Sequence, residues 1–279
     1  MKVVSRALRF GEGPRWRDGW LWFSDMRDGA VKRVRPCGTQ ETVLRLEGDP
    51  SGLGWLPDGS LLVVSMRDHR LLRWTGSRLE TFAELSPWCG GPANDMVVDQ
   101  FGNAFVGNLG FDFSEGEAMR STVLLRVDVR GRVAVVADDL ACPNGMAITP
   151  DGSTLVVGQS ASSELLAFDL DDAGNLSNRR VYAALTEGRV SDGLCMDAEG
   201  SVWVASPMTH EFLHIRPGGE LLRRVDTGER FAIACMLGGD DRRTLFCLTA
   251  ASLDVFGDPE QIGGQVASMR VSVPGAGWP

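Results

Sequence analysis

Residues 191–205 read S-D-G-L-C-M-D-A-E-G-S-V-W-V-A, two short apolar runs (194–196 and 202–205) on either side of the turn signal at 198–200. The carboxylate of Asp192 stands just before the first run. Short apolar runs joined by a turn that contains glycine are typical of a β-hairpin. This stretch therefore predicts a hairpin with an acid at its entrance.

The same unit recurs along the chain, each copy with a polar residue before its first run and a glycine in its turn. These pairs are Glu12 and Gly19, Ser51 and Gly59, Asn94 and Gly102, Asn144 and Gly152, and Asp192 and Gly200. The spacing within a pair is eight in four copies and seven in the first, and a weaker sixth copy begins at Ala234. Successive copies start 39, 43, 50, 48 and 42 residues apart. Periods of this size built from short strands are typical of a radial array with four strands per repeat.

Six such repeats predict an all-β fold, a six-bladed β-propeller with four antiparallel strands per blade and one domain over residues 1–279. Residues 3–10 form a strand-like run that has no blade of its own, and residues 264–273 form another near the opposite terminus. We expect these two runs to complete the last blade together and close the ring, because closure leaves no free sheet edge.

The net charge of −9 and the pI near 4.9 argue against binding to nucleic acid or to an anionic membrane surface. The start lacks the apolar run of a signal peptide, and no stretch has the apolar length of a membrane span. Cys195, Cys235 and Cys247 fall inside apolar strand patterns, which predicts buried thiols. We expect a cytoplasmic protein that is a monomer or a weak homodimer.

Equivalent positions of all blades converge on the axis of a propeller, so four polar side chains are expected at one mouth of the channel. They are Glu12, Asn94, Asn144 and Asp192, and all offer hard oxygen donors. Such donors suit Ca²⁺, Mg²⁺ or Mn²⁺ better than a metal that prefers thiolates. Ser51 and Ala234 show that the same position also accepts residues that would not be ligands.

Simpler interpretations of these residues stay open. Asn144-Gly145 and Asp192-Gly193 are dipeptides typical of turns, and Glu12 alone is an ordinary surface acid. Other chemistries have little support, because the chain has no nucleophile elbow, P-loop or dinucleotide fingerprint. The three histidines, at 69, 210 and 214, lie outside the shared register.

The longest insertion in a repeat is 108–121, between the second and third strands of the third blade. It contains Phe111, Phe113 and Met119. We expect it to lie over the channel mouth and to shape a pocket, although a plain connector would have the same length.

Five segments together resemble the SMP-30/gluconolactonase family of regucalcin-like proteins. They are F-G-E-G-P-R-W at 10–16, N-D-M-V-V-D at 94–99, P-N-G-M-A at 143–147, the whole of 191–205, and V-P-G-A-G at 273–277. The resemblance implies a six-bladed propeller that hydrolyses lactones with one divalent ion, Ca²⁺, Mg²⁺, Mn²⁺ or Zn²⁺. It implies that Glu12, Asn144 and Asp192 hold the ion and that Asn94 contacts the substrate or a metal-bound water.

One position departs from the family. Pro92 stands where sugar lactonases often carry an arginine, and proline has no side-chain donor for hydroxyls or a carboxylate. Three aromatic residues are expected near it as substrate contacts, namely Trp88, Phe111 and Phe113. We therefore expect a cyclic ester less polar than gluconolactone. The alternative is that another arginine takes over the missing role: Arg15, Arg67 or Arg120.

The hypothesis that follows is a metal-dependent lactonase acting on a small lactone-like molecule, in which Asp192 both binds the metal and accepts a proton from the attacking water. Two rivals remain. One is a metal-binding propeller without turnover, and the other is a propeller enzyme of another reaction type, such as a phosphotriester hydrolase.

Overall fold

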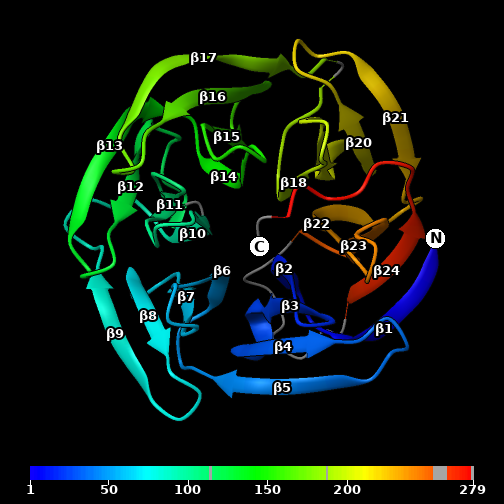
Figure 1. The fold of residues 1–279 in the computed structure, drawn as a ribbon, viewed down its shortest axis with the longest axis horizontal. Coiled ribbons are helices and arrows are strands. Elements are labelled where there is room, and N and C mark those ends of the chain that lie inside the picture. Colours follow the sequence, from blue (N-terminus) through cyan, green and yellow to red (C-terminus); the bar gives the residue numbers. More distant parts are fainter. Residues whose placement is uncertain (113–114, 187, 254–262, 278–279) are drawn as a thin grey trace.

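The computed structural model describes residues 1–112, 115–186, 188–253 and 263–277. Six four-stranded sheets stand around a central axis, and neighbouring strands within each sheet run antiparallel (Figure 1). The predicted six-bladed β-propeller is confirmed.

The first five blades follow the chain in order. The first contains β2 (Gly11–Arg17), β3 (Trp20–Asp25), β4 (Ala30–Val34) and β5 (Gln40–Arg45), and the second β6 (Pro50–Trp55), β7 (Leu61–Ser65), β8 (Arg70–Trp74) and β9 (Leu79–Glu84). The third contains β10 (Ala93–Val98), β11 (Ala104–Asn108), β12 (Thr122–Val127) and β13 (Val133–Leu140), and the fourth β14 (Pro143–Ile148), β15 (Thr154–Gln159), β16 (Glu164–Leu170) and β17 (Leu176–Ala184). The fifth contains β18 (Leu194–Met196), β19 (Val202–Ser206), β20 (Glu211–Ile215) and β21 (Leu221–Asp226). Short 3₁₀ turns, η1 (Met26–Asp28) and η3 (Pro207–Thr209), follow β3 and β19.

The last blade combines both termini. Its strands are ordered β1-β24-β23-β22, with β22 at Phe231–Gly238, β23 at Thr244–Ala250, β24 at Gly264–Arg270 and β1 at Lys2–Leu8. Lys2 stands opposite Ser268 and Leu8 opposite Gly264 in the antiparallel pair. The predicted closure of the ring is confirmed, and β1 takes the outer position of this blade.

Turn geometry explains the spacing within the repeats. In the first blade, Asp18 and Gly19 both have positive φ, 52° and 77°, as a two-residue hairpin turn requires. The fifth blade has a longer turn, in which the carboxylate of Asp197 accepts the backbone N–H groups of Glu199 and Ser201, both at 2.9 Å. The shorter turn accounts for the spacing of seven in the first copy.

A glycine after the shared polar position lets the inner strands of neighbouring blades touch. A Cβ on Gly145 would lie 2.5 Å from the backbone oxygen of Asp192, and one on Gly193 would collide with Ala234. Gly193 instead donates its N–H to the carbonyl of Ile233 in the next blade, at 2.9 Å. Asn144-Gly145 lies within β14, so the turn interpretation is wrong for this pair.

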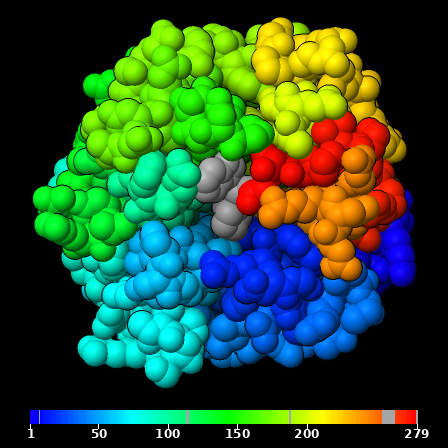
Figure 2. Space-filling model, in the orientation of Figure 1, coloured from blue at the N-terminus to red at the C-terminus, as the bar shows by residue number. Residues whose placement is uncertain are grey.

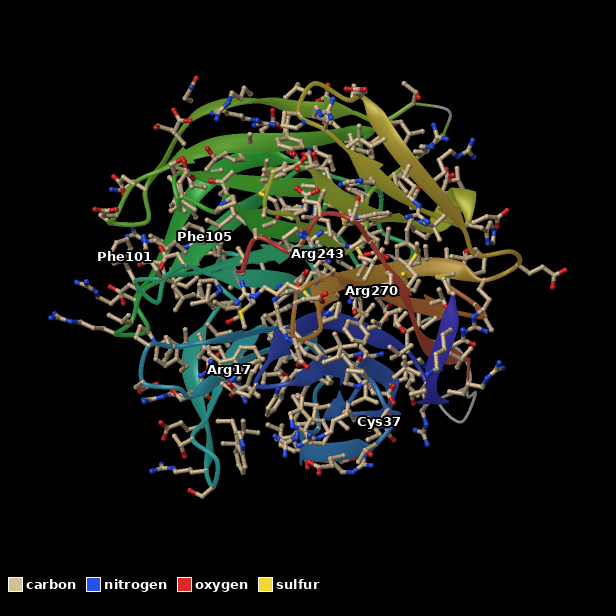
Figure 3. All side chains as sticks on the ribbon, turned by 45° about the vertical axis from the view of Figure 1, so that its right-hand side comes forward. Arg17, Cys37, Phe101, Phe105, Arg243 and Arg270 are labelled. Atoms are coloured by element: carbon tan, nitrogen blue, oxygen red, sulfur yellow. The ribbon has the colours of Figure 1, made fainter. Side chains whose placement is uncertain are left out.

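Apolar side chains fill the space within and between blades. Phe105 in β11 is fully buried, whereas Phe101, in the turn after β10, extends from the surface and is 43% exposed (Figure 3). Cys195, Cys235 and Cys247 are all buried, as predicted, and burial raises the pKa of the Cys235 thiol well above its usual range. Within the described residues, no helix has the length and apolar character needed to cross a membrane.

Candidate active site

The four polar residues in shared register all stand at the beginning of innermost strands, at one mouth of the channel. Glu12 is in β2, Asn94 in β10 and Asn144 in β14, while Asp192 comes just before β18. Asn144 Nδ2 donates to Asp192 Oδ1 at 2.7 Å, which joins the fourth and fifth blades. Glu12, Asn94 and Asn144 are only 6–7% exposed, so their polar atoms have little access to water.

The carboxyl groups at this mouth are held in their protonated forms more strongly than usual. Burial raises the pKa of Glu12 well above its usual range, and the negative charges of Asp192 and Asp95 raise it further. Burial raises the pKa of Asp192 to about 7, and the nearby Asp95 charge adds to the shift. Buried like charges disfavour ionisation, and a cation among them would reverse this effect.

The amide of Asn144 has one satisfied end and one unsatisfied end. Its Nδ2 donates to Asp192 Oδ1 and to Ser160 Oγ at 2.9 Å. Its Oδ1 is buried and, among the residues that the structure describes, accepts no hydrogen bond. An unpaired buried acceptor costs about 1–3 kcal/mol. The oxygen is therefore placed to serve a partner that is not a protein group.

The donor set fits a hard divalent cation. Two carboxylates, from Glu12 and Asp192, and the unpaired oxygen of Asn144 are the hard oxygen ligands that Ca²⁺, Mg²⁺ and Mn²⁺ prefer. Nowhere in the described ranges do three or more His, Cys, Asp or Glu side chains cluster as a metal site. The amide oxygen would thus supply the third ligand in place of another acid.

The two ends of the Asn94 amide differ in their hydrogen bonding. Ser51, at the equivalent position of the second blade, donates its hydroxyl to Asn94 Oδ1 at 3.3 Å. The Nδ2 of Asn94 is buried and has no hydrogen-bond acceptor in the described part of the chain. A donor group is therefore available to an incoming oxygen.

Two charged residues at the channel were not predicted as a pair. Asp95 and Arg15 are 2% and 3% exposed, and Arg15 Nη2 lies 3.2 Å from Asp95 Oδ1, 80 positions away in the chain. The same guanidinium donates to the carbonyl of Met96. A signal existed, because Asp95 breaks a pattern: the residue after the shared polar position is glycine in four other copies, at 13, 52, 145 and 193.

Of the three arginines considered as substitutes for the family's arginine, Arg15 is buried against Asp95 and Arg67 donates to Asp49 Oδ2 at 2.6 Å. Arg120 lies beside the loop of Pro92. Its Nε donates to the Gly110 carbonyl at 2.7 Å, and its Nη2 donates to the Gly90 carbonyl at 3.0 Å. Arg120 therefore ties the two loops together, with its side chain 58% exposed.

The two loops predicted to form the rim lie against each other. The carbonyl of Pro92 accepts the N–H of Leu109 at 2.9 Å, and a Cβ on Gly91 would collide with the backbone of Phe111. Trp88 is 38% exposed and Phe111 is half-buried. Phe113, the third aromatic residue expected here, lies outside the described residues.

An apolar cluster at the same end of the blades was not anticipated. It joins the first, second and last blades, and its buried members are Phe10, Met26, Met66, Ile233 and Ala250. Phe10 immediately precedes β2, and Met26 and Met66 immediately follow β3 and β7. These ends of the strands are the ends that carry Glu12, so the cluster packs at the same end of the blades as the mouth.

The fold and this mouth define a class, the six-bladed propellers with an oxygen-lined site at one end of the axis. A model described as the SMP-30/gluconolactonase/LRE-like region matches residues 10–251. The chain belongs to this family.

Individual relatives agree with the family. A 6-deoxy-6-sulfogluconolactonase of Pseudomonas putida is 27% identical, over 99% of this chain and 96% of that protein. Among solved structures, a luciferin-regenerating enzyme superposes with a TM-score of 0.83 at 21% identity, covering 98% of this chain and 96% of its own. The calcium-binding protein regucalcin from Agrobacterium tumefaciens superposes with a TM-score of 0.82 at 21% identity, covering 98% of this chain and 94% of its own.

Proposed function

We propose that the protein is a divalent-metal-dependent lactonase that opens a cyclic ester to its hydroxy acid. The observation that carries this proposal is the group formed by Glu12, Asp192 and Asn144 Oδ1: the pKa values of both carboxyl groups are raised, and the amide oxygen has no hydrogen-bond partner among the described residues. The lactonase name of the Pseudomonas relative and the calcium-binding description of the Agrobacterium protein support it.

Glu12, Asn144 and Asp192 would hold the ion. A bound divalent ion would supply a Lewis acid that polarises the ester carbonyl. The remaining chemistry belongs to the protein. Asn144 Nδ2 fixes Asp192 by its hydrogen bond to Oδ1, which leaves Oδ2 to accept a proton from the attacking water.

The proposed reaction balances with water alone. The water oxygen bonds to the carbonyl carbon as its proton passes to Asp192 Oδ2. The bond from that carbon to the ring oxygen then breaks, and the ring oxygen takes the proton back from Asp192 to become the hydroxyl of the product. Asn94 Nδ2, unpaired among the described residues, would donate to a substrate oxygen and fix its orientation.

The walls of the mouth favour a lactone less polar than gluconolactone. Pro92 offers no side-chain donor, Trp88 is exposed at the rim, and the cluster around Met26 and Met66 is apolar. Burying apolar substrate surface there gains about 25 cal/mol per Å². Each sugar hydroxyl buried without a partner would cost about 1–3 kcal/mol.

A second candidate substrate is an anionic sugar lactone. The Pseudomonas relative is named for a sulfonated gluconolactone, and Arg120 places a guanidinium at the rim of the same loops. An arginine can bind a sulfonate or carboxylate through two parallel hydrogen bonds. Arg120 Nη2 also donates to Glu117 Oε2 at 3.0 Å, so the anion would have to compete with this carboxylate and with the Gly90 carbonyl.

The test is kcat/KM for three substrates in parallel: a δ-lactone with an alkyl chain, gluconolactone, and its 6-sulfonated analogue. Each is assayed with Ca²⁺, Mg²⁺, Mn²⁺ or Zn²⁺ and after chelation, with a phosphotriester and an open-chain ester alongside. We expect the alkyl lactone to be preferred and chelation to abolish turnover. Full activity of the metal-free protein would contradict metal dependence.

Arg120→Gln separates the two substrate candidates. If the sulfonated lactone is the preferred substrate and this variant loses that preference, the second candidate holds. Turnover of the phosphotriester alone, or metal binding without any turnover, would favour the rival functions.

A further inference from the structure

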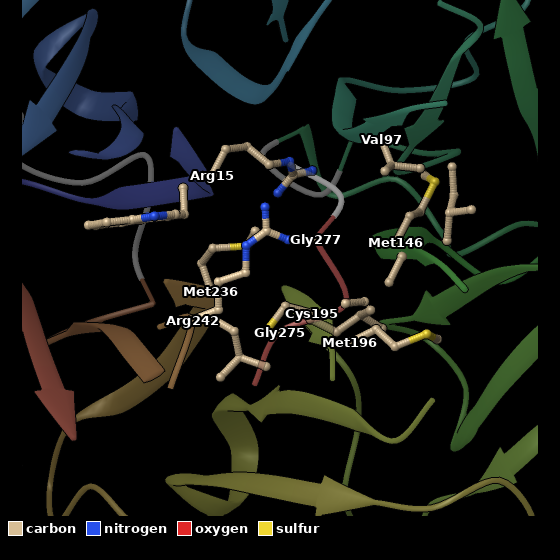
Figure 4. Close-up of a pocket in the computed structure, with 15 residues that line it drawn as sticks. Arg15, Val97, Met146, Cys195, Met196, Met236, Arg242, Gly275 and Gly277 are labelled. Atoms are coloured by element: carbon tan, nitrogen blue, oxygen red, sulfur yellow. The ribbon is translucent and has the colours of Figure 1, made fainter. Parts of the chain in front are cut away.

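A cavity lies at the opposite end of the channel from Glu12, Asn144 and Asp192. Its walls come from the far parts of the same inner strands, and the residues that shape its chemistry are Arg15, Val97, Met146, Met196, Met236 and Arg242 (Figure 4). Four of these six side chains are apolar and the other two are arginines. The charged side chains at the two ends of the channel are therefore of opposite sign.

The chain near its C-terminal end forms one wall of this cavity. On the fifth blade, the N–H of Ala198 donates to the Pro274 carbonyl at 2.8 Å, and the N–H of Ala276 donates to the Met196 carbonyl at 3.0 Å. On the last blade, the N–H of Gly275 donates to the Arg242 carbonyl at 2.9 Å. In Figure 2 the red C-terminal segment reaches the centre of the face turned to the viewer. Backbone hydrogen bonds to two blades thus fix the wall in place.

The positive charges of the two arginines differ in their ion pairing. Arg15 is buried. Its Nη2 pairs with Asp95, and its Nη1 donates to the Pro14 carbonyl at 2.8 Å. Its Nε is buried and finds no acceptor in the described residues. Burial without a partner makes that N–H a site for an oxygen that the protein itself does not provide.

Arg242 supplies a second guanidinium to the cavity. The described part of the chain contains no hydrogen bond or ion pair to its side chain, and a Cβ on Gly277 would collide with its Nη1. Figure 4 shows the Arg15 and Arg242 side chains pointing toward each other within the pocket. Asp95 pairs with Arg15 alone, so the charge of the exposed Arg242 guanidinium has no carboxylate partner among the described residues, in a chain whose net charge is −9.

We propose that this distal cavity binds a small organic monoanion with an apolar body, such as a short-chain carboxylate. The carboxylate would accept hydrogen bonds from Arg242 and from Arg15 Nε, in the charge-assisted geometry that arginine favours. The chain would pack on Met146, Met196 and Met236, whose flexible thioethers adapt to irregular apolar shapes. The cavity shares none of the four residues of the proposed lactonase site, so it can bind its ligand whether or not that activity exists.

The experiment is titration calorimetry of the metal-free protein with hexanoate, and with hexanol and sulfate as probes that lack the charge or the chain. We expect saturable binding of hexanoate and an affinity at least about tenfold lower for Arg242→Ala, because a charge-assisted hydrogen bond is lost. Arg242→Lys should recover part of the loss. The matched control is Arg216→Ala, an exposed arginine on the outer part of the fifth blade that pairs with Glu220.

Asp192→Asn tests which mouth is occupied and should leave hexanoate binding unchanged. Three results would overturn the proposal: no saturable binding to the wild-type protein, equal affinity for Arg242→Ala in a folded variant, or loss of binding in Asp192→Asn. Equal binding of hexanol would refute the role of the arginines, and equal binding of sulfate would refute the role of the methionines. A thermal melt of each variant shows that it is folded.

Discussion

The two ends of the central channel are built from the same six inner strands yet carry opposite chemistry. At one end the buried Glu12 and the half-buried Asp192 are acids with raised pKa values. At the other end Arg15 and Arg242 face a cavity lined by methionines. The repeat therefore specifies the backbone of each blade, while one or two side chains per strand determine what each end can bind.

The ion pair between Arg15 and Asp95 joins the two ends. Asp95 raises the pKa of Glu12 and Asp192 at the acidic mouth, and Arg15 lines the distal cavity. Substituting either partner should therefore change both the pKa values at the acidic mouth and the charge at the distal cavity. The predictions below run from the largest expected effect to the smallest.

The largest effect is expected at the acidic end. Asp192→Asn should lower kcat/KM for the best lactone by about 10³-fold or more, because it removes the charge of a proposed metal ligand and the proposed base. Asn144→Ala should lower kcat/KM less, since the ligand that it would remove is neutral. Ser51→Ala, at the equivalent register position, is the control and should change kcat/KM only a few-fold. Similar kcat/KM for Asp192→Asn and the wild-type protein would show that this acid is not the base.

Removing the charge that connects the two ends should destabilise the fold. Arg15→Met leaves Asp95 buried without its partner and should lower the free energy of unfolding by about 3–5 kcal/mol. Adding Asp95→Asn should recover most of that loss, because the unpaired charge is then gone. Denaturant melts of the two variants measure both changes. A double variant no more stable than Arg15→Met would mean that lost packing, and not the charge, sets the cost.

The acidic end should also make stability depend on pH when no metal is present. The pKa of Asp192 is about 7 in the folded protein against an ordinary 3.8, so the folded state binds the proton more tightly than the unfolded state. The free energy of unfolding should therefore rise as pH falls from about 8 toward 5. Melting temperatures across this range measure it.

Saturating metal should flatten that dependence, because the cation stabilises the ionised carboxylates. Asp192→Asn should flatten it without metal. A metal-free melting temperature that falls between pH 8 and pH 6 would contradict the proposed burial of these acids.

The smallest effect is expected at the rim. Trp88→Ala should raise KM for an alkyl lactone a few-fold and leave gluconolactone nearly unchanged, because only the alkyl chain gains from the apolar surface. Phe101→Ala, an exposed aromatic in the turn after β10, is the matched control. An equal change in KM for both lactones would show that Trp88 does not determine specificity.

Much of this protein follows from its sequence alone. Alternating apolar runs, turn glycines and a shared register predict six blades and the joining of residues 3–10 to 264–273, because each strand must bury its apolar face and each edge must be paired. The structure has this pairing as β1 with β24. The same register and the family motifs together single out Glu12, Asn144 and Asp192 as neighbours, since equivalent positions of a ring meet at its axis. Their role at a metal stays a prediction.

The tertiary structure alone decided what lies across the channel. Arg15 and Asp95 are 80 positions apart, and no local pattern reveals which side chains meet over a closed ring. The glycines after Asn144 and Asp192 look like turn residues in sequence but serve close packing between blades. The distal cavity exists only because the chain near Gly275 returns to Arg242, and such a long-range contact depends on how the blades close, which local propensity does not encode.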